Sequence, residues 1–205
     1  MKNKLIKLLF VITLLWSTVG YADEWDDIIK DAAKNRLSDS KKRTESGKRL
    51  IKEKSQRILE LDAELPILLE HGDLKQAEQG QSEALRLTVE LSDKKDDIKK
   101  IKDIRIPERL IKIGAVLARK GDLGGAMGVL EKSLKIGEPI VKEGSGRLAS
   151  AYDLLARIYY ESGDRKLSEK NATLALGAVL DAYGKDSPEL ELSKALMRKI
   201  CRWEK

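Results

Sequence analysis

The clearest pattern in the chain is a repeated arrangement of apolar and polar positions over residues 107–183. Apolar residues recur at helical spacing on both sides of a Gly-Asp step, which is Gly121-Asp122 in the first copy and Gly163-Asp164 in the second. Glycine suits the left-handed residue that ends a helix, and aspartate suits the N-cap of the following helix. Each copy therefore predicts two helices joined by a tight turn, and the two glycines lie 42 residues apart.

Small residues stand where the two helices of each predicted pair would cross. Gly114 and Ala156 lie in the first helices, and Ala126 and Ser168 lie one turn into the second helices. Larger side chains at these places would hold the backbones apart, or would overpack at a cost of about 1–3 kcal/mol. We therefore expect closely packed antiparallel pairs.

This order of positions resembles the tetratricopeptide repeat, whose skeleton is W-x2-L-G-x2-Y…A-x3-F…P. The period is eight residues longer than the usual one and is similar to that of the kinesin-light-chain-type variant, as are the stretches at 151–156 and 183–189. The resemblance implies an all-α fold and the binding of a protein or peptide, without chemistry. The matching positions are Leu110 and Tyr152 at the tryptophan, Leu117 and Tyr159 at the tyrosine, Leu130 and Ala172 at the phenylalanine, and Pro139 near the closing proline.

Further helices are expected on both sides of the two copies. A degenerate first repeat spans residues 51–106 around the turn at Gly72-Asp73, although Glu64 and Pro66 depart from the family pattern and Pro66 is expected to kink its helix. The charged stretch at 92–102 either prolongs the second helix of that pair or loops out, and Pro107 is expected to start the next helix. After Pro188, a last helix is expected to cap the stack, with Trp203 closing the cap. The predicted fold is thus an all-α, right-handed solenoid of about three hairpins with a C-terminal capping helix.

Residues 1–22 have the pattern of a signal peptide. Three lysines precede an apolar run from Leu8 to Trp16, and small residues stand at the positions that a signal peptidase reads before Asp23. We expect cleavage between Ala22 and Asp23 and a periplasmic or secreted mature chain without an integral span. The alternative is an uncleaved N-terminal anchor.

Residues 23–50 divide into an amphipathic helix and a polar stretch. The helix either docks on its neighbour or lies on a membrane surface, and the four acidic residues at its start favour docking. Residues 38–49 form either a linker or the exposed start of a long helix. Apolar positions seven apart after Ile51 leave a coiled-coil oligomer as an alternative to packing within the solenoid. The apolar face of the first helix consists of Trp25, Ile28, Ile29, Ala32 and Ala33.

Composition excludes several functional classes. The net charge of +6 falls to +3 when residues 1–22 are removed, which argues against nucleic acid as a partner. A single histidine, His71, and a single cysteine, Cys201, allow no His/Cys metal cluster, and His71 sits in a helix-joining turn. We expect neither a cofactor nor an enzymatic activity, and we expect Cys201 to be a bystander rather than an intermolecular bridge.

The resemblance implies that the first helix of each hairpin lines a concave groove. The family's two-carboxylate clamp is not matched, because Asp62 and Leu154 stand where it needs basic or amide side chains. The leading hypothesis is a non-enzymatic scaffold or adaptor that binds a protein or peptide in this groove, within a repeat region at 107–205. The alternative is an oligomeric structural component of a cell-envelope complex that assembles through its N-terminal helices. The predicted groove residues are Lys112, Ala115, Arg119, Asp153, Arg157 and Tyr160.

Overall fold

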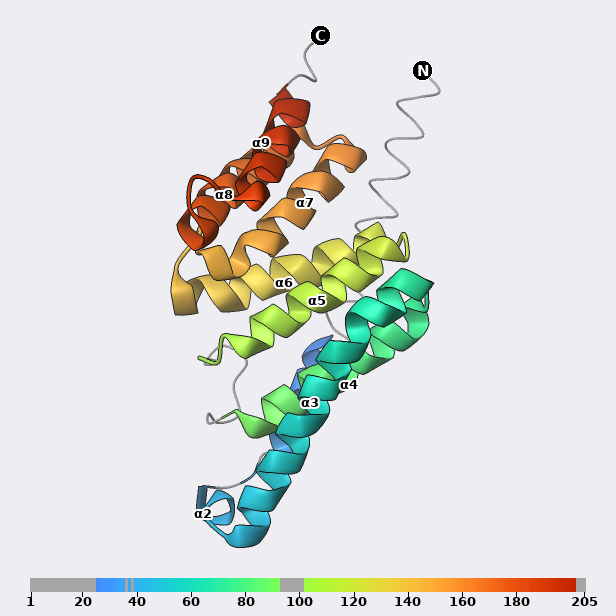
Figure 1. The fold of residues 1–205 in the computed structure, drawn as a ribbon, viewed down its shortest axis with the longest axis vertical. Helices are drawn as coiled ribbons and strands as arrows, with labels where there is room; N and C mark the ends of the chain where they lie inside the picture. The colour runs from blue at the N-terminus through green and yellow to red at the C-terminus, as the bar shows by residue number, and fades with distance from the viewer. Residues whose placement is uncertain (1–24, 36, 38, 93–101, 202–205) are drawn as a thin grey trace.

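The computed structural model describes residues 25–201 except 36, 38 and 93–101, and Figure 1 shows its elongated arrangement of helices. All regular elements among the described residues are helical, which confirms the all-α class. The expected signal peptide at 1–22, most of the charged stretch at 92–102 and Trp203 lie outside the described residues.

The helices pack mainly on their neighbours in sequence, as three successive pairs and a last helix. After the short helix α2 (Asp39–Lys42), α3 pairs with α4, α5 with α6, and α7 with α8, while α9 packs against α8. A single 3₁₀ turn, η2 (Gly146–Leu148), connects the second pair to the third. The bounds are Glu45–His71 for α3, Leu74–Leu91 for α4, Arg105–Arg119 for α5, Leu123–Val141 for α6, Ala149–Ser162 for α7, Arg165–Tyr183 for α8 and Pro188–Cys201 for α9.

The Gly-Asp turns have the predicted geometry. All three glycines before the aspartates have positive φ, with 80° at Gly72, 81° at Gly121 and 86° at Gly163, a region that side chains disfavour. Asp122 accepts a hydrogen bond from the backbone nitrogen of Gly125 at 2.9 Å, and Asp164 caps α8 in the same way. Asp73 makes no such bond. The first turn thus keeps the backbone of the motif without its side-chain cap.

Small residues bring the paired helices close together, as expected. A Cβ atom at Gly114 of α5 would lie 2.6 Å from Cγ of Leu130 of α6, so the glycine makes room for that leucine. In the third pair, the Ser168 hydroxyl donates to the carbonyl oxygen of Ala156 at 2.9 Å across the two helices. Ala126 is fully buried. The sequence-based interpretation of the crossing points is confirmed in both pairs.

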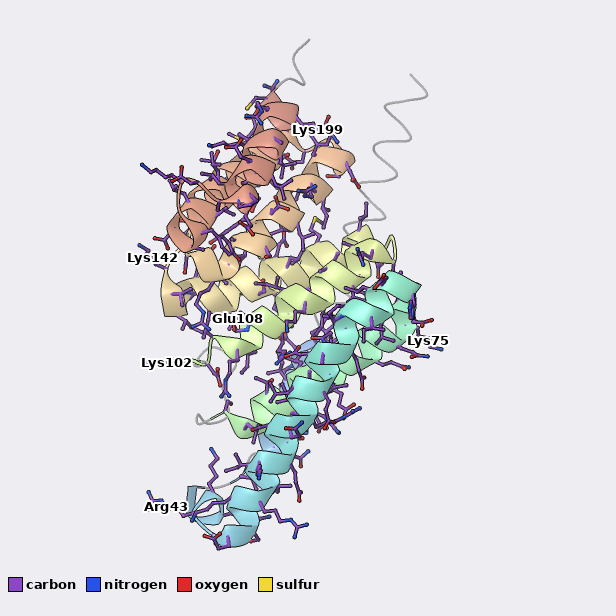
Figure 2. All side chains as sticks on the ribbon, viewed as in Figure 1. Arg43, Lys75, Lys102, Glu108, Lys142 and Lys199 are labelled. Carbon is purple, nitrogen blue, oxygen red and sulfur yellow. The ribbon has the colours of Figure 1, made fainter. Side chains whose placement is uncertain are left out.

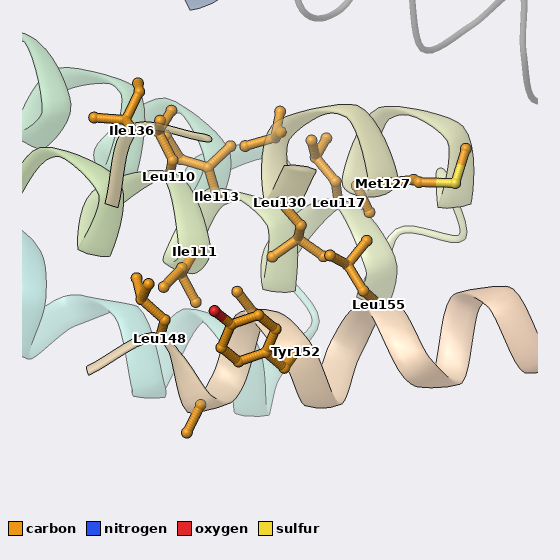
Figure 3. Close-up of a cluster of buried hydrophobic side chains, with 14 of the residues drawn as sticks. Leu110, Ile111, Ile113, Leu117, Met127, Leu130, Ile136, Leu148, Tyr152 and Leu155 are labelled. Atoms are coloured by element: carbon orange, nitrogen blue, oxygen red, sulfur yellow. The ribbon is translucent and has the colours of Figure 1, made fainter. Parts of the chain in front are cut away.

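One continuous core runs along the pairs, and Figure 3 shows its middle part. Leu110, Ile113 and Leu117 of α5 meet Leu130 of α6, while Tyr152 approaches from α7. Each of these five side chains has no accessible surface. The middle pair therefore supplies the apolar contacts that join the two outer pairs.

The first described segment, residues 25–34, is a helix that docks on the rest of the chain. Trp25, Ile29 and Ala32 are buried in the main core, and Ile28 and Ala33 pack at its edge. These are the residues of the predicted apolar face, so docking on the chain is confirmed for this helix. An ion pair between Asp26 and Lys132 of α6 accompanies the apolar contact.

Of the two alternatives for residues 38–49, the start of a long helix holds for the part from Glu45 onward. Helix α3 starts at Glu45, so residues 45–49 form the exposed start of a long helix rather than a linker. It continues through Pro66 to His71. Likewise α5 starts at Arg105, two residues before the expected Pro107, because proline is tolerated anywhere in a first turn.

The last helix, α9, begins at Pro188 as expected and covers the end of the third pair. Leu196 and Ile200 pack with Ala156 and Ala172 in a small separate cluster. Leu192 is 67% exposed and Ala195 is exposed as well, because the buried stripe follows Leu190 and Ser193 instead.

Candidate functional site

A charged hollow lies over the first helices of the three successive pairs. Its volume is about 400 Å³ and it is open to solvent. Asp62 of α3 forms one wall, five residues of the first two turns of α5 form the floor, and η2 and α7 close the other side. The lining residues are Asp62, Arg105, Glu108, Arg109, Ile111, Lys112, Arg147 and Ser150.

Asp62 holds two cations of α5 against α3. It accepts hydrogen bonds from Arg109 and, at 2.6 Å, from the Nζ atom of Lys112. Burial alone would raise the pKa of Asp62, but the bonds from Arg109 and Lys112 outweigh it and hold the pKa below its usual value. Asp62 therefore stays ionised at neutral pH and fixes the register of α5 on α3.

Further ion pairs surround the hollow. Nε of Arg147, in η2, donates to Oε1 of Glu108 at 2.8 Å and so joins the second pair to the third. Arg105 forms a two-pronged contact with Asp103, with 2.6 Å between its Nη2 and the carboxylate oxygen Oδ2. Four cations and two carboxylates line the hollow. It can therefore bind a ligand through ion pairs and charge-assisted hydrogen bonds.

Two tyrosines fix the position of α7 beside α6. The hydroxyl of Tyr152 donates to Glu138 at 3.0 Å and accepts from the backbone nitrogen of Gly144 at 3.0 Å. Burial, together with the Glu138 carboxylate, raises the pKa of Tyr152 to about 12, although the Gly144 bond opposes the shift. Tyr159 donates to Glu131, and its pKa is raised chiefly by burial. Both hydroxyls are thus neutral donors at neutral pH, and they set the wall that carries Ser150.

The three predicted groove residues on α5 lie along one face of that helix, and two of them contact α3. Lys112 lines the hollow and binds Asp62. One turn further on, Ala115 is half-buried, and the guanidinium of Arg119 donates to the carbonyl oxygen of Leu69 at 3.2 Å. Lys112 and Arg119 thus hold two pairs together as well as facing solvent.

The three predicted residues on α7 form a second group. Arg157 donates to Asp153 of the preceding turn at 2.7 Å. The ring of Tyr160 lies 5.0 Å from Nζ of Lys199 of α9, a cation–π contact. None of these three lines the hollow. The predicted set is therefore split between the wall of the hollow and the α7–α9 surface beyond it.

Sequence reasoning missed the residues that give the hollow its charge, namely Arg105, Arg109 and Arg147. The pairs that α5 forms with Asp62 join residues 47 and 50 positions apart, and no local spacing indicates such a register. One signal was available in the sequence. Asp62 is an acid at a position where the tetratricopeptide clamp has a basic or amide side chain, and an acid there is expected to face cations on the neighbouring helix. The hollow contains no histidine or cysteine, and the described residues include no group of three or more potential metal ligands.

No helix in the described part of the chain combines the length and the apolar character that a membrane crossing needs. No family model and no curated protein matches this chain.

Proposed function

We propose that this protein is a non-enzymatic, tetratricopeptide-like scaffold or adaptor, exported to the periplasm or secreted, that holds a protein or peptide partner. Its three pairs and capping helix form a short right-handed solenoid, and the first helices α3, α5 and α7 line the concave side. The observation that carries the proposal is the open, charged hollow to which these three helices contribute. An open hollow with ion-pairing side chains suits an extended polypeptide better than a small substrate, which usually occupies an enclosed, largely apolar site.

Recurring local geometry supports the repeat interpretation. Three left-handed glycines precede three aspartates, and small residues lie at the crossing of the second and third pairs. The lining supplies four cations, two carboxylates that are already bound by those cations, and a serine hydroxyl, but no histidine or cysteine, which favours recognition over catalysis.

The alternative is an oligomeric structural component that assembles through its N-terminal helices, and the first of these helices does not support it. The apolar face of residues 25–34 is buried within the same chain, so it offers no apolar surface to a second copy.

A site-specific cross-linking experiment in the native compartment tests the proposal. A photoreactive residue in place of Ala115 is expected to capture one recurrent partner, because this half-buried position lies one turn beyond Lys112 on the groove face. The same residue in place of Thr173, an exposed position of α8, serves as the matched control and should not capture that partner.

A second substitution tests whether the groove charge matters. Arg147→Glu is expected to reduce capture at position 115, because it reverses an exposed cation that lines the hollow, while helicity, measured by circular dichroism, stays unchanged. Equal capture from positions 115 and 173, or capture that Arg147→Glu leaves unaltered, would contradict the groove assignment.

A further inference from the structure

The end of the molecule opposite α9 is a projecting tip built from α2 and the start of α3 (Figure 1). Helix α3 has 27 residues and its partner α4 has 18, so α3 outruns α4. The ion pair between Lys54 and Glu90 marks the place where α4 ends against α3. Residues 45–53 extend past this point, and α2 lies beside them.

The tip is a folded structure with a close backbone contact. Thr44 caps α3 by accepting a hydrogen bond from the backbone nitrogen of Gly47 at 3.1 Å, and its hydroxyl donates to the carbonyl oxygen of Lys41 at 2.7 Å. A Cβ atom at Gly47 would lie 1.8 Å from that same carbonyl oxygen. The absence of a side chain at Gly47 therefore lets α2 fold back onto α3, and the cations of both helices meet at one end.

Positive charge is concentrated at this tip. The tip, residues 39–53, carries six cations and three acids, a net charge of +3, which equals the net charge of residues 23–205 as a whole, from 37 basic and 34 acidic residues. Among the described residues, Arg43 and Lys52 have no ion-pair partner, and both are exposed. Lys48 and Arg49 pair only with exposed carboxylates on their own helix. The tip thus carries net positive charge, whereas the charges of the other residues of 23–205 cancel.

We propose that this tip docks on the surface of an anionic lipid bilayer through the phosphate groups of its lipids. The shape favours a flat surface, since the charged residues sit on a convex projection and not in a groove that could enclose a strand (Figure 2, near Arg43). Residues 39–54 contain no aromatic side chain, so nothing at the tip can stack on a nucleic-acid base. The two apolar residues of the tip's helix, Leu50 and Ile51, are half-buried, so binding is electrostatic and peripheral.

The strength of this docking follows from the number of cations. Each Lys or Arg near an anionic surface strengthens binding about fivefold, and the effect fades within a Debye length. Several such cations together give measurable but salt-sensitive binding. The tip lies away from the charged hollow, so this proposal does not rest on the function proposed above.

Vesicle sedimentation of the full chain tests the proposal. Wild type should bind vesicles with 30% phosphatidylglycerol in phosphatidylcholine and bind pure phosphatidylcholine far less, with the difference shrinking as salt increases. The triple variant Arg43→Glu, Lys48→Glu, Lys52→Glu is expected to lose about 100-fold of the anionic binding. Residues 1–22 are the same in the wild type and in the triple variant, so any insertion of their apolar run into the vesicles is the same for both.

A matched control separates the tip from net charge. The variant Lys75→Glu, Lys166→Glu, Lys185→Glu changes the same charge at three exposed lysines on α4, α8 and the loop before α9, and it should bind anionic vesicles like wild type. If the tip variant loses helicity, the milder Arg43→Gln, Lys52→Gln variant replaces it, with an expected loss of about 25-fold.

Three outcomes would overturn the proposal. The first is that the tip variant binds anionic vesicles as well as the wild type does. The second is that the control variant loses as much binding as the tip variant. In the third, a single-stranded oligonucleotide competes the wild type off the vesicles at a lower phosphate concentration than anionic lipid does, which would assign the tip to nucleic acid instead.

Discussion

At the residue scale, the close approach of paired helices depends on single glycines, which have no side chain. Gly114 is the clearest case, because any Cβ atom there would overlap Leu130, which is itself fully buried. Where a glycine faces open space, the same atom would cost nothing. The two situations occur in neighbouring pairs of this chain and can be compared directly.

We expect Gly114→Ala to lower the free energy of unfolding by about 1–3 kcal/mol through overpacking. The matched control is Gly177→Ala in α8, where an added Cβ meets nothing within 4 Å. That change should stabilise the protein by about 0.5–1 kcal/mol, since alanine is the better helix former. Urea denaturation followed by circular dichroism measures both. A stabilised Gly114→Ala variant would mean that the two helices do not cross there.

Local residue patterns account for the elements that the sequence predicted well. The Gly-Asp turns and the small residues at the crossings depend on contacts within one hairpin. Their residues therefore recur at a fixed spacing in the sequence, from which they can be predicted. The apolar face of residues 25–34 was predicted for the same reason, since one helical period sets it. The start of α3 stayed one of two alternatives, because residues 38–49 carry almost no apolar side chain to mark a helix.

At the element scale, the pairs are held in register by contacts that no local pattern reveals. Asp62 of α3 binds both Arg109 and Lys112 of α5, and Lys120 at the end of α5 binds Glu78 of α4. These partners are far apart in sequence and meet only when two hairpins stack. This explains why the charge of the hollow could not be predicted, although the helices that carry it were.

We expect Asp62→Asn to lower the free energy of unfolding by about 1–3 kcal/mol at pH 7, because two partly buried cations lose their carboxylate. The folded-state pKa of Asp62 is lowered, so its stabilisation is complete above the unfolded value of 3.8 and is lost as pH falls below it. Wild type and variant should therefore converge in acid. Chemical denaturation between pH 2.5 and 7 measures this difference.

The control for Asp62 is Asp153→Asn, which removes the i,i+4 partner of the exposed Arg157 within a single helix. Such pairs contribute about 0.3–0.5 kcal/mol, so this variant should remain close to wild type throughout the pH range. If both variants behaved alike, the contacts between α3 and α5 would not be what stabilises the stack.

At the scale of the whole molecule, residues 25–34 join parts of the chain that are distant in sequence. Their apolar face packs into the core that α4 and α6 share, and Asp26 binds Lys132 of α6. The helix therefore braces the first pair against the second. Its undocking can be followed through Trp25, which is only 2% exposed.

We expect Ile29→Asp to shift the fluorescence of Trp25 to longer wavelength and to weaken the fold, because it places a carboxylate in a fully apolar contact. The measurement needs Trp16→Phe and Trp203→Phe so that Trp25 is the only tryptophan. Lys30→Asp, at the exposed neighbouring position, is the control and should leave the emission unchanged. Unaltered emission in Ile29→Asp would contradict the docked helix.

The overhang of α3 has a consequence for orientation. Nine residues beyond α4 correspond to a rigid rod of roughly 14 Å at about 1.5 Å per residue, and this rod is continuous with the helix that carries Asp62. If the start of α3 is held on a surface, the rest of the protein cannot rotate freely, so its other faces keep a constant angle to that surface. Bound in this way, the protein would hold its hollow at a fixed distance from that surface and in a fixed orientation.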